Sequence, residues 1–86
     1  MSARKTMNLE IIGSNIAEAI EQLKELQGNA TNETLTEAEF QVGLRQAYHH
    51  LNFSWNIRHV ATSQYASLTK QQFDKWGKYP ASIEKL

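Results

Sequence analysis

The strongest pattern in the first third of the chain is a run of apolar residues at alternating steps of three and four. Its members are Leu9, Ile12, Ile16, Ala19, Leu23 and Leu26. This spacing places their side chains on one face of a helix, as in helices that pack lengthwise. Gly28 follows, and glycine commonly ends a helix because it adopts the left-handed conformation without strain. The pattern predicts a helix over about residues 8–27, with Thr6 or Asn8 as its N-cap.

Two later segments carry the same signature of a helix start. In each, a threonine N-cap is followed three residues later by Glu or Gln, and a leucine and a phenylalanine flank this capping box as a hydrophobic staple. The segments are Leu35–Phe40 and Leu68–Phe73. The first predicts a long helix over about residues 37–63, and the second a short helix over about residues 70–76 that Gly77 and Pro80 end.

The predicted long helix has two apolar faces. One consists of Phe40, Leu44, Ala47, Tyr48, Leu51 and Trp55, and the other of Val42, Phe53, Ile57 and Val60. A helix of this kind must be covered on both apolar sides. We expect helix 8–27 to cover the first face and a second copy of the chain to cover the other. Alternation of polar and apolar residues over residues 51–58 also fits a half-buried strand, which we keep as an alternative although the sequence offers no partner strand.

These elements predict an all-α fold in a single domain over residues 1–86, with residues 1–6 and 81–86 frayed. The two long helices form an antiparallel hairpin, and the short helix packs across its open end. A chain of this length has a thin core, which an additional subunit often supplements. We therefore expect a homodimeric helical bundle. The candidate interface residues are Phe53, Ile57, Val60, Trp55 and Trp76.

A polar stripe between the apolar faces is the only candidate for specific chemistry. It consists of Arg45, His49, Asn52, Asn56 and His59. A zinc site needs three or four converging ligands, whereas His49 and His59 lie about 15 Å apart along one helix. Residues 40–73 contain no carboxylate, and no nucleophile–base spacing is present. We predict no metal, cofactor or catalytic residue. The stripe either supplies hydrogen bonds that set the helix register or faces solvent.

Charge and composition narrow the function further. Residues 1–40 carry three basic and seven acidic side chains, and residues 41–86 carry six basic and two acidic ones. The basic residues form no cluster, which argues against a nucleic-acid partner. The chain has no cysteine and no long apolar segment, so we expect a cytoplasmic protein without a membrane partner.

Three hypotheses about function remain. The first is a small homodimeric protein–protein interaction module. The second is a helical regulator or inhibitor, of the antitoxin or phage type, that binds a macromolecular partner. The third is a small enzyme or metal-binding protein that uses the histidines of the polar stripe. The uneven charge suits packing of the first helix against the later ones, head-to-tail assembly or steering toward a partner.

Overall fold

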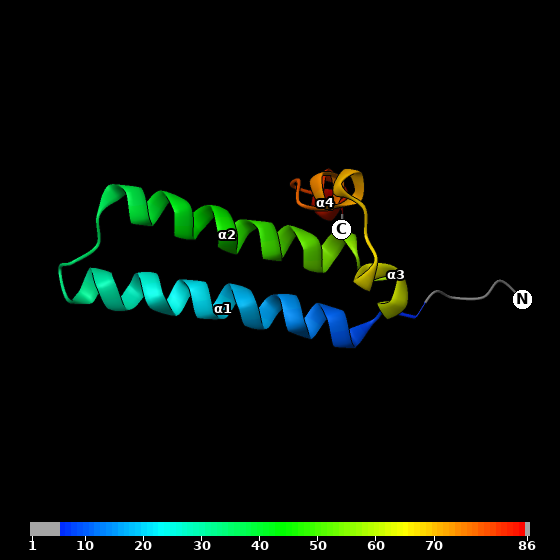
Figure 1. Ribbon diagram of the computed structural model, residues 1–86, viewed down its shortest axis with the longest axis horizontal. Helices are drawn as coiled ribbons and strands as arrows, with labels where there is room; N and C mark the ends of the chain where they lie inside the picture. Colours follow the sequence, from blue (N-terminus) through cyan, green and yellow to red (C-terminus); the bar gives the residue numbers. More distant parts are fainter. Residues whose placement is uncertain (1–5, 86) are drawn as a thin grey trace, which may run out of the picture.

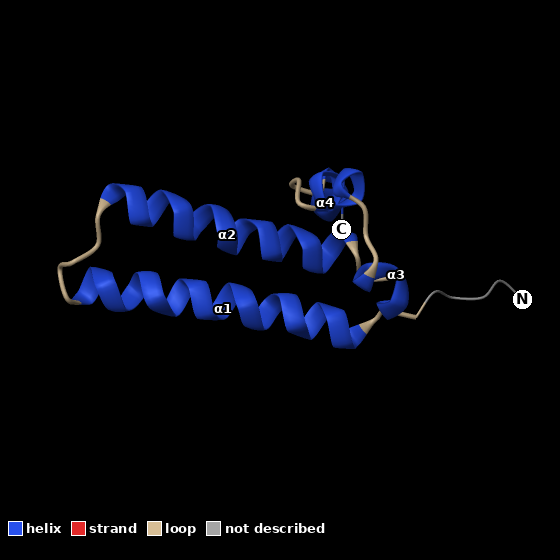
Figure 2. Cartoon of the chain, viewed as in Figure 1, coloured by secondary structure: helices blue, strands red, loops and turns tan. Residues whose placement is uncertain are grey.

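The computed structural model describes residues 6–85, and all regular structure in that part of the chain is helical. The elements in chain order are α1 (Leu9–Thr31), α2 (Glu37–Asn56), α3 (Thr62–Ala66), α4 (Lys70–Trp76) and the 3₁₀ helix η1 (Ala81–Lys85). The helices α1 and α2 form an antiparallel hairpin, α3 lies at its open end, and α4 lies against α2 (Figure 1). Figure 2 shows helices in place of the strand that residues 51–58 could have formed, so that alternative is wrong.

The predicted helix starts are confirmed. The side chain of Asn8 accepts a hydrogen bond from the backbone N–H of Ile11, which makes Asn8 the N-cap of α1. Thr36 and Thr69 each form a complete capping box, with Glu39 and Gln72 respectively. The short helix over residues 70–76 is present with the predicted bounds. Residues 81–85, which we expected to be frayed, form the 3₁₀ helix η1. The structure does not describe residues 1–5 and 86, so their predicted fraying lies outside the described residues.

The predicted end of the first helix is wrong. Helix α1 continues through Gly28 to Thr31, and no described glycine has a positive φ. The chain instead reverses at Glu33, which has a φ of 59°. The N–H of Asn32 donates to the carbonyl of Gly28, and the N–H of Thr34 donates to that of Asn29. These bonds satisfy the last carbonyls of the helix, so a glycine C-cap is not needed.

The predicted end of the second helix is also wrong, because α2 stops at Asn56 and not near residue 63. The N–H of Asn8 donates to the carbonyl of Arg58 at 2.7 Å, and its side-chain amide donates to the carbonyl of Val60 at 2.8 Å. Because α1 begins at Leu9, a longer α2 would extend past the end of α1 and leave apolar side chains uncovered. The turn after Asn56 brings the following residues back toward the hairpin.

The core lies at the open end of the hairpin. Ile11, Phe53 and Ile57 are buried there, and four half-buried side chains pack against them, namely Val60, Tyr65, Leu68 and Trp76. Burial of each large apolar side chain contributes about 1.5–3 kcal/mol. The short segments α3 and α4 are therefore the cover for one apolar face of α2.

Toward the loop, the two long helices approach closely at Gly43. A Cβ atom at this position would lie 2.6 Å from Cδ2 of the buried Leu26 side chain. At Gly13, by contrast, a Cβ would meet no other atom within 4 Å. Gly43 therefore permits a close contact between α1 and α2, whereas Gly13 has no such role.

Two alanine substitutions test this contact. We expect Gly13→Ala to stabilise the protein by about 0.5–1 kcal/mol through the higher helix propensity of alanine. Gly43→Ala should lose this gain and destabilise the protein by about 1 kcal/mol, because the new methyl group overpacks the helix contact. Chemical denaturation monitored by circular dichroism measures both. Equal stabilisation by the two substitutions would contradict the close approach at Gly43.

Candidate functional site

The centre of the polar stripe holds α4 against α2. The side-chain amide of Asn52 donates to the carbonyl of Gly77 at 2.8 Å. The amide of Asn56 donates to the carbonyls of Trp76 at 2.8 Å and Lys78 at 3.0 Å. Carbonyls at a helix C-terminus have no partner within their own helix. These two asparagines therefore act as side-chain caps for α4 and set its position on the hairpin.

His49 lies beside these asparagines, between two aromatic rings. The centroid of its ring is 4.4 Å from that of Phe53 and 4.5 Å from that of Phe73. A Cβ at Gly77 would lie 2.6 Å from its Nδ1 and Cε1 atoms, so only glycine allows this approach. Burial lowers the pKa of His49 below its ordinary value of 6.5, and the charge of His50 lowers this pKa further. The imidazole is thus held in an environment that favours its neutral form.

The structure does not bring the whole predicted stripe together. Arg45 and His59 are exposed, and Nδ1 of His59 lies 3.4 Å from the carbonyl oxygen of Thr6. The stripe residues that contact α4 or the residues directly after it are His49, Asn52 and Asn56. These three residues therefore help to position α4 on the hairpin.

A second polar cluster, which the sequence did not indicate, lies between α1 and α2. The buried side-chain amide of Asn15 donates to the carbonyl of Ile11 at 2.9 Å and to the hydroxyl of Tyr65 at 3.3 Å. Its Oδ1 lies 3.0 Å from Nδ1 of His50. The signal that could have found it is the four-residue spacing of Ile11, Asn15 and Ala19, which makes Asn15 part of the inward face of α1.

Two adjoining cavities border the histidines, with volumes of about 320 and 230 Å³. Both are lined by His49, His50 and Phe73, and no carboxylate lines either one. Within residues 6–85, no three His, Asp or Glu side chains lie close enough together to hold a metal ion. General-base catalysis by a histidine depends on a nucleophile within hydrogen-bond reach, and often on a carboxylate that orients the ring. The geometry therefore gives no support to the enzyme or metal hypothesis.

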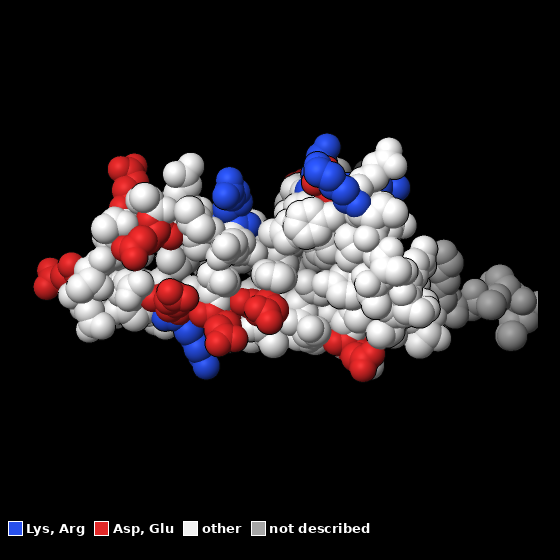
Figure 3. All heavy atoms as spheres, in the orientation of Figure 1, with Lys and Arg blue, Asp and Glu red and all other residues white. Residues whose placement is uncertain are grey.

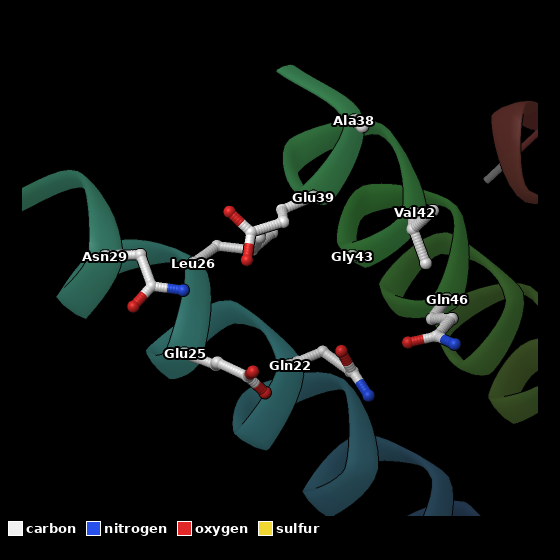
Figure 4. A pocket seen from close by; sticks show the side chains of 9 residues that line it. All are labelled: Gln22, Glu25, Leu26, Asn29, Ala38, Glu39, Val42, Gly43 and Gln46. Atoms are coloured by element: carbon white, nitrogen blue, oxygen red, sulfur yellow. The ribbon is translucent and has the colours of Figure 1, made fainter. Parts of the chain in front are cut away.

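A larger hollow of about 390 Å³ lies near the loop, between α1 and α2. Figure 4 shows that its side chains come from both helices, with Glu25 on one and Glu39 on the other. Val42 and Leu26 supply apolar surface. This hollow lies on one side of the hairpin, and the cavity lined by Leu23, Tyr48 and Leu51 lies on the other side.

Two of the five predicted interface residues belong to the core of the single chain. Phe53 and Ile57 are 2% and 0% exposed within the single chain, so they are core residues and cannot form a surface for a second copy. Val60 and Trp76 pack against this core. Trp55 is half-buried, and its indole N–H donates to Oγ of Ser82 at 3.1 Å. The prediction is wrong for Phe53 and Ile57, because the segments after α2 supply the cover that it assigned to a second copy.

The other apolar side of the hairpin is open instead. We define the open apolar face by six side chains that are between 39% and 61% exposed: Ile16, Ile20 and Leu23 of α1, and Phe40, Tyr48 and Leu51 of α2. Shallow cavities run along it, and one is lined by Leu23, Leu44 and Tyr48 while the next is lined by Ile16, Leu51 and Trp55. The expectation that helix 8–27 covers this side of α2 is wrong. The residues of α1 that face inward are Ile11, Asn15, Ala19 and Leu26. Only Ala19 and Leu26 belong to the apolar run that predicted this helix.

Comparison with known proteins gives no further information about the site. The chain matches no protein-family model, and no curated protein or solved structure shows significant similarity to it. Among the described helices, none combines the length and the apolar character needed to cross a bilayer.

The capping role of Asn56 leads to a local effect on stability. Asn56→Ala removes two hydrogen bonds to carbonyls at the end of α4, at a cost of about 1–2 kcal/mol. We expect faster amide hydrogen exchange in α4, while the amides in the middle of α1 and α2 stay protected. Arg45→Ala, an exposed member of the same stripe, is the matched control and should leave α4 unchanged. Uniform loss of protection along the whole chain would contradict a local role.

His49 should make stability depend on pH. Because its pKa is lower in the folded than in the unfolded state, the folded state binds fewer protons. Its contribution is full above about pH 6.5 and is lost as the pH falls through the lowered folded pKa. We expect denaturation curves at pH 7.5 and 5 to show a smaller loss of stability in His49→Gln than in the natural chain. His59→Gln, at an exposed position, should retain the natural pH dependence, and an equal change in both variants would contradict the assignment.

Proposed function

We propose that this chain is a small protein–protein interaction module that works as a homodimer through the open apolar face. The observation that carries the proposal is the contiguous exposure of large apolar side chains on one side of both long helices. Monomeric proteins rarely expose an apolar patch of more than a few hundred Å², and larger patches commonly mark interaction sites. The cytoplasmic location expected from the sequence belongs to the same proposal.

The size of the face suits a stable association. Helix α1 has 23 residues, which corresponds to a length of about 34 Å. Two helices side by side span roughly 20 Å, since their axes lie about 8–10 Å apart and each helix is about 10–12 Å wide. A partner that covered the whole face would approach the standard interface of about 800 Å² per subunit.

A second copy fits this face because it too consists of two antiparallel helices. Two hairpins packed face to face make a four-helix bundle, in which each apolar stripe meets another apolar stripe. This arrangement differs from the predicted dimer, because it uses the opposite face of α2. It also gives the thin core of the single chain a second apolar layer.

The alternative is a regulator or inhibitor that binds a different macromolecule. The observation in its favour is the uneven charge. In Figure 3 the acidic side chains gather over α1 and the loop end of the hairpin, and most of the basic ones lie over α4 and the middle of α2. Such a distribution can steer a charged partner. We rank this function second because the apolar face is the larger feature.

Lysine substitutions on the two sides of the hairpin test the dimer. Near a two-fold axis a new lysine meets its own copy, so Ile20→Lys and Tyr48→Lys should each convert a dimer into a monomer through desolvation and like-charge repulsion. Val42→Lys is the matched control. Val42 is 45% exposed, close to the 47% of Ile20, but it lines the hollow on the opposite side. It should leave the dimer intact.

The measurement is molar mass by light scattering at several protein concentrations, with circular dichroism to verify folding. The natural chain should approach twice 9.8 kDa as its concentration rises. A mass that stays at 9.8 kDa up to high concentration would overturn the homodimer and favour the alternative function.

A further inference from the structure

On the side of the open apolar face, α2 carries a stripe of apolar residues whose positions are symmetric along the helix. Its centre lies between Ala47 and Tyr48, and Leu44 and Leu51 are equidistant from this point. Phe40 and Trp55 are also equidistant from it. Leu44 and Leu51, and likewise Phe40 and Trp55, are therefore pairs of apolar residues that an antiparallel second copy would bring together in reciprocal contacts.

Charged residues at the two ends of this stripe continue the symmetry. Glu37 is 18 residues before Trp55, which is five helical turns, so both lie at the same angle around α2. At the other end, the guanidinium group of Arg58 lies 3.9 Å from the centroid of the Trp55 ring. Glu37 and Arg58 are again equidistant from the centre, and their charges are opposite.

The stripe of α1 has its centre at the same level. Ile16 and Leu23 are equidistant from the midpoint between Ala19 and Ile20. Contacts between the helices place this midpoint beside Ala47, because Asn15 contacts His50 on one side of it and Leu26 contacts Gly43 on the other. One two-fold axis can therefore pass through the centres of both stripes.

We infer that two copies pack face to face and antiparallel about this axis, so that α2 lies on α2 and α1 on α1. Leu44 of each copy meets Leu51 of the other, and Glu37 of each copy lies near Arg58 of the other. The inference rests on the proposed function and adds the partner's orientation and register. The acidic loop end of each hairpin then lies over the end that carries Arg58, and the opposite arrangement would place like charges together.

Spin-label distances test the orientation, since the natural chain contains no cysteine. Labels can be attached through Ala38→Cys and Arg45→Cys, because both positions are exposed and neither belongs to the open apolar face. In the antiparallel dimer the two labels at position 38 are separated by about 29 Å along the helix axis, and those at position 45 by about 8 Å. Both pairs of labels are also separated across the interface by a similar distance, so the measured distance should be longer for position 38 by less than the difference of about 21 Å along the axis. Two hairpins that point the same way would give nearly equal distances.

The outcomes separate the inference from the proposed function. A monomer in light scattering overturns both. A dimer with nearly equal label distances retains the homodimer and overturns the antiparallel arrangement. A dimer with the longer distance at position 38 supports both.

A charge exchange tests the register at the ends of the interface. Glu37→Lys and Arg58→Glu should each weaken dimerisation about tenfold, because each places two like-charged pairs in the symmetric interface. The double variant should recover most of the affinity, which a simple folding defect in Arg58→Glu could not produce. Glu25→Lys, with the same change in charge on the opposite side of the hairpin, is the control and should have little effect. Failure of the double variant to recover affinity would overturn the pairing of Glu37 with Arg58.

Discussion

Burial of Phe53 and Ile57 against Ile11 is the contact on which the arrangement of the other elements depends. These three side chains form the fully buried centre of the molecule at the open end of the hairpin. The last two turns of α2 must therefore lie beside the first turn of α1, and the two hydrogen bonds from Asn8 to the turn after α2 maintain this alignment. With α2 ended there, the chain can return as α3 and α4 and complete the cover of the core.

Hydrogen bonds from side chains make this cover possible, because α3 and α4 are short. A helix of seven residues is not stable alone, and tertiary contacts must supply its stability. Asn52 and Asn56 cap the end of α4, while His49 packs against Gly77 and between two phenylalanine rings. The centre of the polar stripe, which was the only candidate for specific chemistry in the sequence, thus attaches α4 to the hairpin.

The same arrangement explains why one apolar face remains free. The segment after α2 is long enough to cover one side of the hairpin, and it covers the side that contains Phe53. Ile16, Ile20 and Tyr48 on the other side have no counterpart in the described chain. We propose a second copy as the cover of this face because the stripes of α1 and α2 share a common centre.

The sequence by itself determined the local structure. The capping boxes at Thr36 and Thr69 and the N-cap at Asn8 predicted the helix starts, because each depends on side chains within four residues of one another. The two apolar faces of α2 were also visible in its periodicity. The helix ends were harder to predict. Helix α1 passes Gly28 because the residues that follow it satisfy the last carbonyls, and α2 stops at Asn56, where hydrogen bonds from Asn8 hold the turn after the helix.

Only the tertiary structure decided which apolar face is buried and what the polar stripe does. Periodicity places Phe53 and Tyr48 on different faces, but it contains no information about which face the last thirty residues will cover. The roles of Asn15, Gly43 and Gly77 likewise depend on contacts with residues far away in the sequence. A contact between distant segments requires the fold to bring them together, and for this reason the exposed apolar face could be located only from the structure.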